Sequence, residues 1–293
     1  MKPQSLESFL HQDRIDIGRL TIENPKIEKE ELFFDVEKEI TEEEWKGMQE
    51  ELWKYRKDRN WDNFAQYARE LKTLFPARQN ELGVDDQDWQ SIKKEMQQAR
   101  QEKRWPRLLR VALLLKRLFP QRQSEIGLTE NDYQEIQADI QMYKDMNKND
   151  GKMPGLWLYE DMLEVKLLFP QHQVELNLTE QDWQEIKKEM ENSRVARNGW
   201  RLAECAVLLR LLFPQRQAEV GLTNQDYEQI RKNIEDYRAS KFWIGFTGTV
   251  LDMKILIAEE AVITDKGELK IIMPKPKDDL HQEKPPMPVI RNF

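Results

Sequence analysis

The chain has 293 residues, 34% of them charged and 39% hydrophobic, and a formal net charge of −8. With 9 Trp, 11 Phe and 7 Tyr this balance excludes a disordered chain, and the acidic total disfavours a protein that neutralises nucleic acid over its whole surface. Cys205 is the only cysteine, which excludes an intramolecular disulfide and a cysteine-rich metal site; with no apolar run near the ~20 residues of a membrane helix, we expect a cytoplasmic protein without membrane contact.

Residues 1–40 precede the regular part of the sequence. The segment from Arg14 to Ile22 alternates polar and apolar residues, which is typical of a strand. We expect residues 1–40 to form a cap, because the first unit of a helical array needs a cover over its exposed apolar face.

A unit of 44 residues recurs from residue 41 onward. Its clearest part is the stretch from Leu118 to Leu128, which has close copies at 74–84, 168–178 and 212–222. The repeats span 41–84, 85–128, 129–178, 179–222 and 223–260. In period and helix-pair content the array is similar in size to HEAT and armadillo repeats and differs from the 34-residue tetratricopeptide unit. The sequence therefore predicts an all-α, right-handed-type α-solenoid of five helical-hairpin repeats.

The first helix of each unit begins with the same chemistry. A Thr or Asp at the N-cap is followed three residues later by a carboxylate, which is the spacing of a capping box. An aliphatic residue precedes the cap and an aromatic residue occupies the fourth helical position, as in a hydrophobic staple. The cap and acid pairs are Thr41 and Glu44, Asp85 and Asp88, Thr129 and Asp132, Thr179 and Asp182, and Thr223 and Asp226.

The second helix is more apolar, so we expect it to form an inner layer. It runs into Phe-Pro in four units, where the missing proline N–H should end the helix and begin a short turn. Gly83, Gly127, Asn177 and Gly221 then close that turn, because these residues tolerate the left-handed conformation.

Two features depart from the repeat. The third unit carries six extra residues near 147–152, which predict a protruding loop. In the fifth unit Ile257-Ala258 replaces Phe-Pro, and residues 261–273 predict a β-hairpin with its turn at 265–267, which we expect to be a C-terminal cap of the array. The proline-rich residues 274–293 read as an extended tail.

No catalytic, cofactor or metal site is expected from these residues. His11, His172 and His281 are far apart in sequence, and the units hold no common residue at the Cys205 position. The run from Asp145 to Leu156 fails the calcium-loop pattern, since its twelfth position lacks a bidentate Glu.

Two polar columns recur and are our candidate partner-binding residues. One follows each Phe-Pro and the other lies four residues before each Pro. Their residues are Arg78, Arg122, His172 and Arg216, and Lys72, Lys116, Lys166 and Arg210. Either they make hydrogen bonds between adjacent units, or they form a polar ladder for an extended peptide or an oligonucleotide backbone.

The second unit is basic, with eight Lys or Arg between residues 100 and 122, among them the tentative site residues Arg104, Arg107 and Arg110. If several share one face, an acidic partner or RNA could dock there. The aromatic segment 242–246 is either covered by the hairpin and tail or open to a second copy as the C-terminal end face of the array.

These patterns favour a non-catalytic scaffold that binds a protein or peptide partner through the repeated polar face. The alternative is an RNA- or ribosome-associated protein that uses the basic second repeat, and an enzyme is the least favoured class.

Overall fold

A computed structural model of the chain describes residues 40–150, 155–258, 260–264 and 269–273. This part is predominantly helical, with one two-stranded sheet. The expected cap at 1–39, the hairpin turn at 265–267 and the tail from residue 274 lie outside the described residues.

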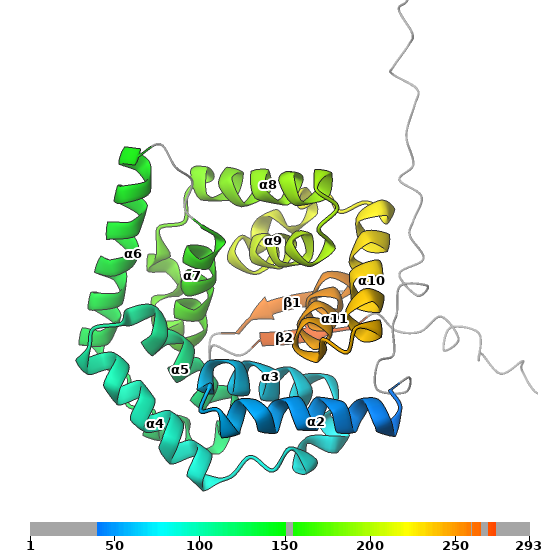
Figure 1. Ribbon diagram of the computed structural model, residues 1–293. Coiled ribbons are helices and arrows are strands. Elements are labelled where there is room, and N and C mark those ends of the chain that lie inside the picture. Colours follow the sequence, from blue (N-terminus) through cyan, green and yellow to red (C-terminus); the bar gives the residue numbers. More distant parts are fainter. Residues whose placement is uncertain (1–39, 151–154, 259, 265–268, 274–293) are drawn as a thin grey trace, which may run out of the picture.

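The helices come in pairs, with one partner outside and one inside (Figure 1). The outer helices are α2 (Glu42–Lys57), α4 (Asp86–Gln101), α6 (Glu130–Asp150), α8 (Glu180–Val195) and α10 (Asn224–Ala239). The inner helices are α3 (Trp61–Leu74), α5 (Trp105–Leu118), α7 (Leu156–Leu168), α9 (Gly199–Leu212) and α11 (Trp243–Ile257). Short 3₁₀ helices follow four inner helices: η3 (Pro76–Leu82), η4 (Pro120–Glu125), η5 (Pro170–Leu176) and η6 (Pro214–Glu219).

The predicted capping boxes are present at all five outer helices. In α2, the hydroxyl of Thr41 accepts from the backbone N–H of Glu44, and the Glu44 carboxylate accepts from the backbone N–H of Thr41. The other four outer helices make the same pair of bonds. Each box satisfies backbone donors that a helix start leaves without a partner.

The Phe-Pro pairs end the inner helices as expected. Phe75 leaves the helical conformation (φ −129°, ψ 63°) and sets its ring edge-on to Trp45, with 5.3 Å between ring centroids. The turn after Pro76 ends at Gly83, whose φ of 62° is costly for a residue with a Cβ atom. The same aromatic pairing recurs in the next three units. A local sequence motif therefore sets the packing between each turn and its outer helix.

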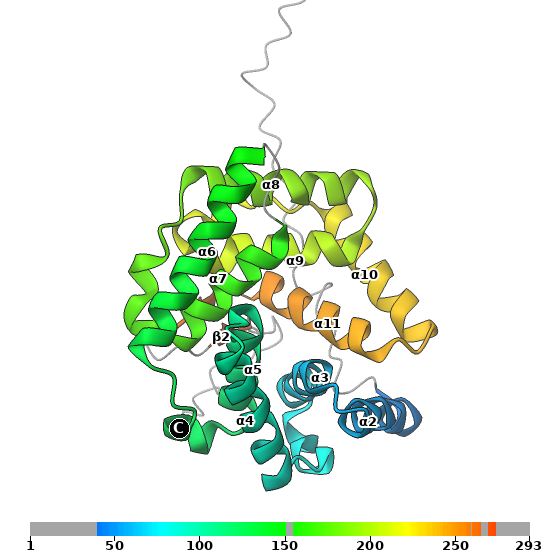
Figure 2. The ribbon, with the colours of Figure 1, turned by 60° about the vertical axis from the view of Figure 1, so that its left-hand side comes forward.

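The inner helices form a closed circuit. α3 packs on α5, α5 on α7, α7 on α9 and α9 on α11, and α11 returns to pack on α3 (Figures 1 and 2). Their buried residues make one continuous core. The described part of the chain thus has no exposed first or last helix pair.

A basic residue near the end of each outer helix reaches the capping-box acid of the next outer helix. The pairs are Arg56 with Asp88, Arg100 with Asp132, Lys144 with Asp182, Arg194 with Asp226, and Arg238 with Glu44. The last pair joins α10 to α2 and closes the ring with the contact used between the other neighbours.

The C-terminal end face expected at residues 242–246 is largely covered, and Phe242 is its exposed large side chain. Trp243 and Phe246 are buried, and Trp243 lies against Gly47 of α2, where an added Cβ would sit 2.8 Å from the indole Nε1. Thr247 donates to Glu70 of α3 at 2.6 Å. The fifth helix pair covers this face with the first pair of the same chain.

The extra residues of the third unit are helical further than expected. The pattern predicts a loop at 147–152, whereas α6 continues to Asp150 and is longer than the other outer helices. The four residues from Asn147 to Asp150 contain no Gly or Pro that would stop the helix before Gly151. Residues 151–154 lie outside the described part of the chain.

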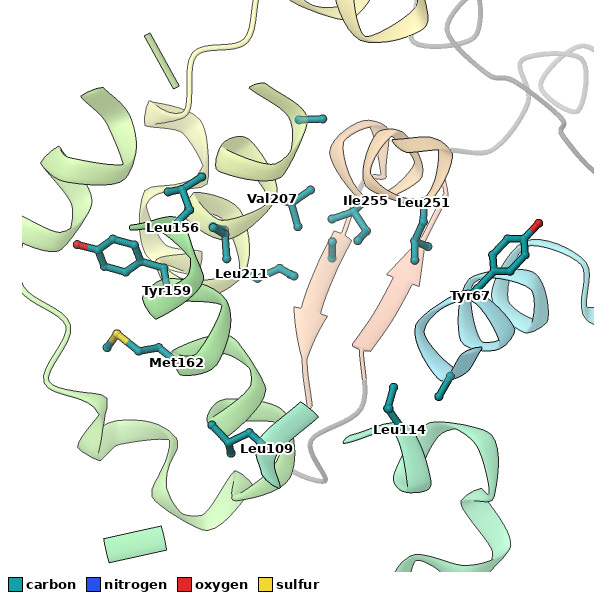
Figure 3. Packing of buried hydrophobic residues seen from close by; sticks show 14 of the residues in the cluster. Tyr67, Leu109, Leu114, Leu156, Tyr159, Met162, Val207, Leu211, Leu251 and Ile255 are labelled. Carbon is teal, nitrogen blue, oxygen red and sulfur yellow. The ribbon is translucent and has the colours of Figure 1, made fainter. Parts of the chain in front are cut away.

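The predicted hairpin is confirmed. Strand β1 (Glu260–Ile263) pairs antiparallel with β2 (Leu269–Ile272), with Ala261 opposite Ile271. β1 packs on α9, and Figure 3 shows the strands among side chains of α9 and α11, including Val207 and Leu251. The hairpin therefore occupies the centre of the ring at the side where the inner helices end.

Candidate binding cavity

The inner helices enclose a central space with two connected parts. A cavity of about 470 Å³ is lined mainly by the first halves and middles of the five inner helices. A second cavity of about 360 Å³ is lined by their later halves and by Leu269 and Ile271 of the hairpin. Both cavities share Arg69, Arg117 and Asp252. The hairpin narrows the space at one side, and we take the larger cavity as the candidate site.

The larger cavity is lined by charged residues at positions where the five units differ. The polar lining residues come from all five inner helices. They are Gln66, Arg69, Glu70, Arg110, Arg117, Glu160, Glu164, Arg201, Glu204 and Asp252. Apolar side chains fill the wall between them, among them Leu113, Leu163, Val207 and Leu251. Trp200 also lines the cavity and stays 39% exposed, so it borders the outside.

Two arginines on α5 face the cavity with no hydrogen bond or ion pair to any described residue. Arg110 and Arg117 lie two helical turns apart and both act electrostatically on the Glu164 carboxyl of α7. Burial and the nearby Arg69 lower the pKa of Arg117, while Glu164 and Glu70 oppose that change. Guanidinium groups without a fixed partner are suited to bind a carboxylate or another planar anion.

The acidic side of the cavity begins with Glu70 on α3. Its carboxylate accepts from Thr247 at 2.6 Å and from Gln66 at 3.1 Å, and the Arg69 guanidinium lies 3.5 Å away. Burial raises the pKa of Glu70, and the charge of Arg69 and the bond from Thr247 work in the opposite direction. Glu70 is thus already bonded within the chain and ties α3 to α11.

Glu164 and Asp252 are different, because neither carboxyl has a hydrogen bond from any described residue. Oε2 of Glu164 is buried without a partner. Burial raises the pKa of Glu164 to about 8, with a further rise from Asp161, while Arg110 and Arg117 lower it. Burial also raises the pKa of Asp252 to about 8, helped by Glu70 and opposed by Arg69. Folded chains bond nearly all of their buried polar atoms, so a buried carboxyl oxygen without a partner in the chain marks a candidate ligand contact.

A carboxyl pair joins α7 to α9 across the same cavity. Burial raises the pKa of Glu204 to about 8, and the neighbouring Glu160 carboxyl raises it further. Neighbouring carboxyl groups oppose each other's ionisation, so Glu204 is the group of this pair that holds its proton more tightly than usual. Arg201 donates to Glu204 at 2.7 Å and opposes the rise.

The first predicted polar column makes contacts within its own unit. Arg122 binds Asp86 at 3.0 Å and Glu125 at 2.8 Å, and its guanidinium lies 4.2 Å from the ring centroid of Trp89. Arg78 and Arg216 repeat this arrangement, and His172 binds Glu130 and stacks on Tyr133. These side chains join the start of each outer helix to the turn that follows the inner helix.

The second predicted column bonds to the end of the next inner helix. Lys166 donates to the carbonyl of Leu211 at 2.9 Å. The equivalent bonds of Lys72 and Lys116 go to the carbonyls of Leu118 and Leu167. The guanidinium of Arg210 donates to the carbonyls of Ile255, Leu256 and Ala258. A cation there satisfies carbonyls that a helix end leaves unpaired and complements the helix dipole. The second column therefore bonds between adjacent units, as one of the two interpretations expected, whereas the first column bonds within its own unit and not between units.

The basic run of the second unit does not form one surface. Arg104 pairs with Glu102, and Arg107 pairs with Glu95 at 2.6 Å. Arg100 binds Asp132 of the next outer helix, whereas Arg110 and Arg117 face the cavity. Residues close in sequence are thus distributed over an outer face, a helix junction and the interior.

Neither a thiol nor a metal-ligand cluster marks the site. Cys205 is fully buried, and burial raises its pKa to about 12, so the thiol stays protonated. Among the described residues no group of His, Cys, Asp or Glu has the arrangement of a metal site. His11 and His281 lie outside those residues.

Sequence reasoning missed every charged residue of the cavity except Arg110 and Arg117, which it assigned to a surface patch. It also missed the column Arg56, Arg100, Lys144, Arg194 and Arg238. That column recurs with the period of the unit and could have been found by the same alignment that revealed the lysines. The cavity acids carry a weaker signal, because they recur at two positions of the unit without filling either: Glu70, Glu164 and Asp252 share one position with two leucines, and Glu160 and Glu204 share the other with Gln66, Arg110 and Gly248.

Comparisons of the chain with protein-family models, with curated proteins and with solved structures found no match. Among the described residues, no helix has the length and apolar character to cross a membrane.

Proposed function

We propose that the five units are an α-solenoid closed into a ring and that the protein is a non-catalytic binding protein, which takes part of its partner into the central cavity. The observation that carries the proposal is the set of ionisable groups in that cavity without a hydrogen bond or ion pair to a described residue, Arg110, Arg117, Glu164 and Asp252. A concave site with a few convergent polar groups on an apolar wall is the usual form of a ligand site.

The repeated and the non-repeated residues have different roles. Residues that recur at equivalent positions in four or five units, such as Arg122 and Lys166, are bonded within the chain, so they support the ring. Residues that differ between units, such as Glu164 and its counterpart Leu208, line the cavity. Positions that face a ligand need different chemistry in each unit, whereas positions that join units need the same chemistry.

A peptide partner fits the cavity better than it fits the polar ladder suggested by the sequence. The ladder arginines and lysines would have to leave their intramolecular bonds to bind a partner, which costs the stability those bonds supply. Arg110, Arg117, Glu164 and Asp252 in the cavity have no such bonds to break. Trp200, exposed beside the cavity, offers an aromatic contact to the part of a peptide that stays outside.

RNA binding through the second unit has less support, because Arg104 and Arg107 pair with carboxylates and Arg110 faces inward. A salt titration with single-stranded RNA tests it. Affinity that is strong at low ionic strength and falls steeply with added salt would favour RNA over a peptide.

A cavity-filling substitution tests the main proposal. Gly248 lines the cavity, and a Cβ there would lie 3.5 Å from Glu70 Oε1, an ordinary contact, so Gly248→Met extends a side chain into the space without a backbone clash. Compounds retained by the purified chain, released on denaturation and identified by mass spectrometry, should be absent from Gly248→Met. They should remain with Gln97→Met, which changes an exposed position of α4. Equal retention by both variants would refute binding in the cavity.

A further inference from the structure

The unpaired ionisable groups of the cavity are separated by type, because the arginines stand on one helix and the carboxyls stand on others. Arg110 and Arg117 stand on α5. Asp252 stands on α11, and the Glu160–Glu204 pair joins α7 to α9. In the closed circuit of inner helices α5 has α3 and α7 as neighbours, so α9 and α11 lie across the cavity from it. The space therefore has a basic wall and an acidic wall.

The other two arginines of the cavity do not add to the basic wall. Arg69 lies beside Glu70, and Arg201 is bonded to Glu204. Their charges are thus offset by a carboxylate on the same helix. Glu160 adds to the negative field at Asp252, which places these carboxyls within electrostatic reach of each other.

A ligand with a single charge would suit only one of these walls. An anion bound at Arg110 and Arg117 would leave Asp252 without a hydrogen-bond partner, and a cation at Asp252 would leave the two arginines without one. Unpaired groups in a closed site reduce affinity, because they have lost water and gained nothing in exchange. A molecule with one charge of each sign satisfies both walls.

We propose that the cavity binds a small zwitterion, a free amino acid or short peptide, with its carboxylate at Arg110 and Arg117 and its ammonium group at Asp252 and Glu160. The proposal rests on the proposed function and names its ligand class. The apolar side chains of Leu113, Leu163 and Leu251 lie on the wall between the poles and would contact the carbon skeleton of the ligand. A volume of about 470 Å³ lies within the range of small-ligand sites.

The state of Glu164 supports this arrangement. With a pKa raised to about 8 its carboxyl is protonated near neutral pH, so it neither neutralises the arginines of α5 nor repels a bound carboxylate. A protonated carboxyl can also donate a hydrogen bond to that carboxylate. Asp252, with the same raised pKa, would ionise when an ammonium group binds beside it.

The test uses the full-length chain and isothermal titration with alanine, dialanine and trialanine. Each probe is offered free, with an acetylated amino end, and with an amidated carboxyl end. We expect one of the three unblocked probes to bind best, because its length matches the distance between the two walls. Either blocking group should weaken its binding about tenfold or more, as loss of a charge-assisted bond does. Blocked and free forms that bind alike would overturn the proposal.

Variants assign each pole. Arg117→Gln should weaken the free probe about tenfold and leave the amidated probe unaffected, because that probe has no carboxylate to lose. Asp252→Asn should weaken binding of the free probe about tenfold and leave binding of the acetylated probe unaffected, because that probe has no ammonium group to lose. Arg107→Gln, also on α5 but paired with Glu95, is the matched control and should bind like the unaltered chain.

The outcome separates this inference from the proposed function. If no alanine probe binds but Gly248→Met still loses retained compounds, the cavity is a site for another ligand class and the zwitterion inference is wrong. If the free probes bind equally well to Gly248→Met, they bind outside the cavity and both statements fail. Loss of probe binding in Gly248→Met, with the pattern of blocked forms described above, supports both.

Discussion

The guanidinium of Arg238 binds the carboxylate of Glu44 across the junction of α10 and α2, with Nε 2.6 Å from Oε1, although 194 residues separate them in sequence. The same Glu44 completes the capping box of α2. One carboxylate thus stabilises both the start of the first described helix and the closure of the ring, and several predictions depend on that closure.

Glu44→Gln should weaken ring closure. The amide keeps a capping oxygen but loses the charge-assisted bonds to Arg238, so we expect about 1–3 kcal/mol less stability at neutral pH. Arg238 lowers the pKa of Glu44 to about 2, so the contribution is present above about pH 4.5 and is lost as the pH falls toward 2. Denaturant unfolding of both chains from pH 6 to pH 2.5 should show the difference shrinking. A constant difference would contradict this account.

Gly47→Leu should open the same junction by steric conflict. The new Cβ would lie 2.8 Å from Nε1 of Trp243, and the larger side chain forces α2 and α11 apart, at a cost of about 1–3 kcal/mol. Trp243→Leu in the same chain should restore part of the loss by vacating the space. The control is Ser91→Leu at the equivalent position of α4. Thermal melts of the three variants measure the effect, and equal melting of Gly47→Leu and the unaltered chain would exclude a tight junction.

Lys166→Met tests the lysine column as a structural feature. The substitution keeps the stem but leaves the carbonyl of Leu211 without its donor in a buried place, so we expect about 1–3 kcal/mol of destabilisation. Lys188→Met, at an exposed position of α8, should change stability little. If both variants unfold at the same denaturant concentration, the bond to Leu211 adds nothing to stability.

Arg122→Ala combined with Arg216→Ala should lower the melting temperature without changing ligand binding. Each change removes two ion pairs and a contact over a Trp ring. These groups face their own unit and not the cavity. Calorimetry and peptide titration on one preparation separate the outcomes, because weaker peptide binding with unchanged melting would restore the ladder as a binding surface.

The raised pKa of Glu164 makes stability depend on pH in the direction opposite to Glu44. The folded chain holds this proton more tightly than the unfolded chain, so the free energy of unfolding falls as the pH rises from about 4.5 to about 8 and is then level. Glu164→Gln should remove the contribution of Glu164 to this decrease in the free energy of unfolding. Above pH 8 the variant should therefore melt at a higher temperature than the unaltered chain. Glu228→Gln on the exposed face of α10 is the control. Identical pH profiles for Glu164→Gln and the unaltered chain would show that Glu164 is ionised throughout.

Local chemistry allowed much of the chain to be interpreted before any coordinates were considered. Capping boxes such as Thr41 with Glu44, the Phe75-Pro76 helix end and the left-handed Gly83 act within a few residues, so their signals lie side by side in the sequence. The short hairpin from Glu260 to Ile272 was accessible for the same reason. The helix pairs, their boundaries and their inner and outer faces follow from these local rules.

Only the tertiary structure decided that the ends of this array meet. Closure depends on the rotations between neighbouring pairs summed over all five of them, and no single residue encodes that sum. Once Arg238 reaches Glu44, the inner faces enclose a space, and residues as distant as Arg110 and Asp252 share it. The sequence by itself determined where each helix begins and ends and which of its sides is apolar, because these features depend on short-range interactions. The cavity and the pairing of its charges arose from packing between residues far apart in the chain.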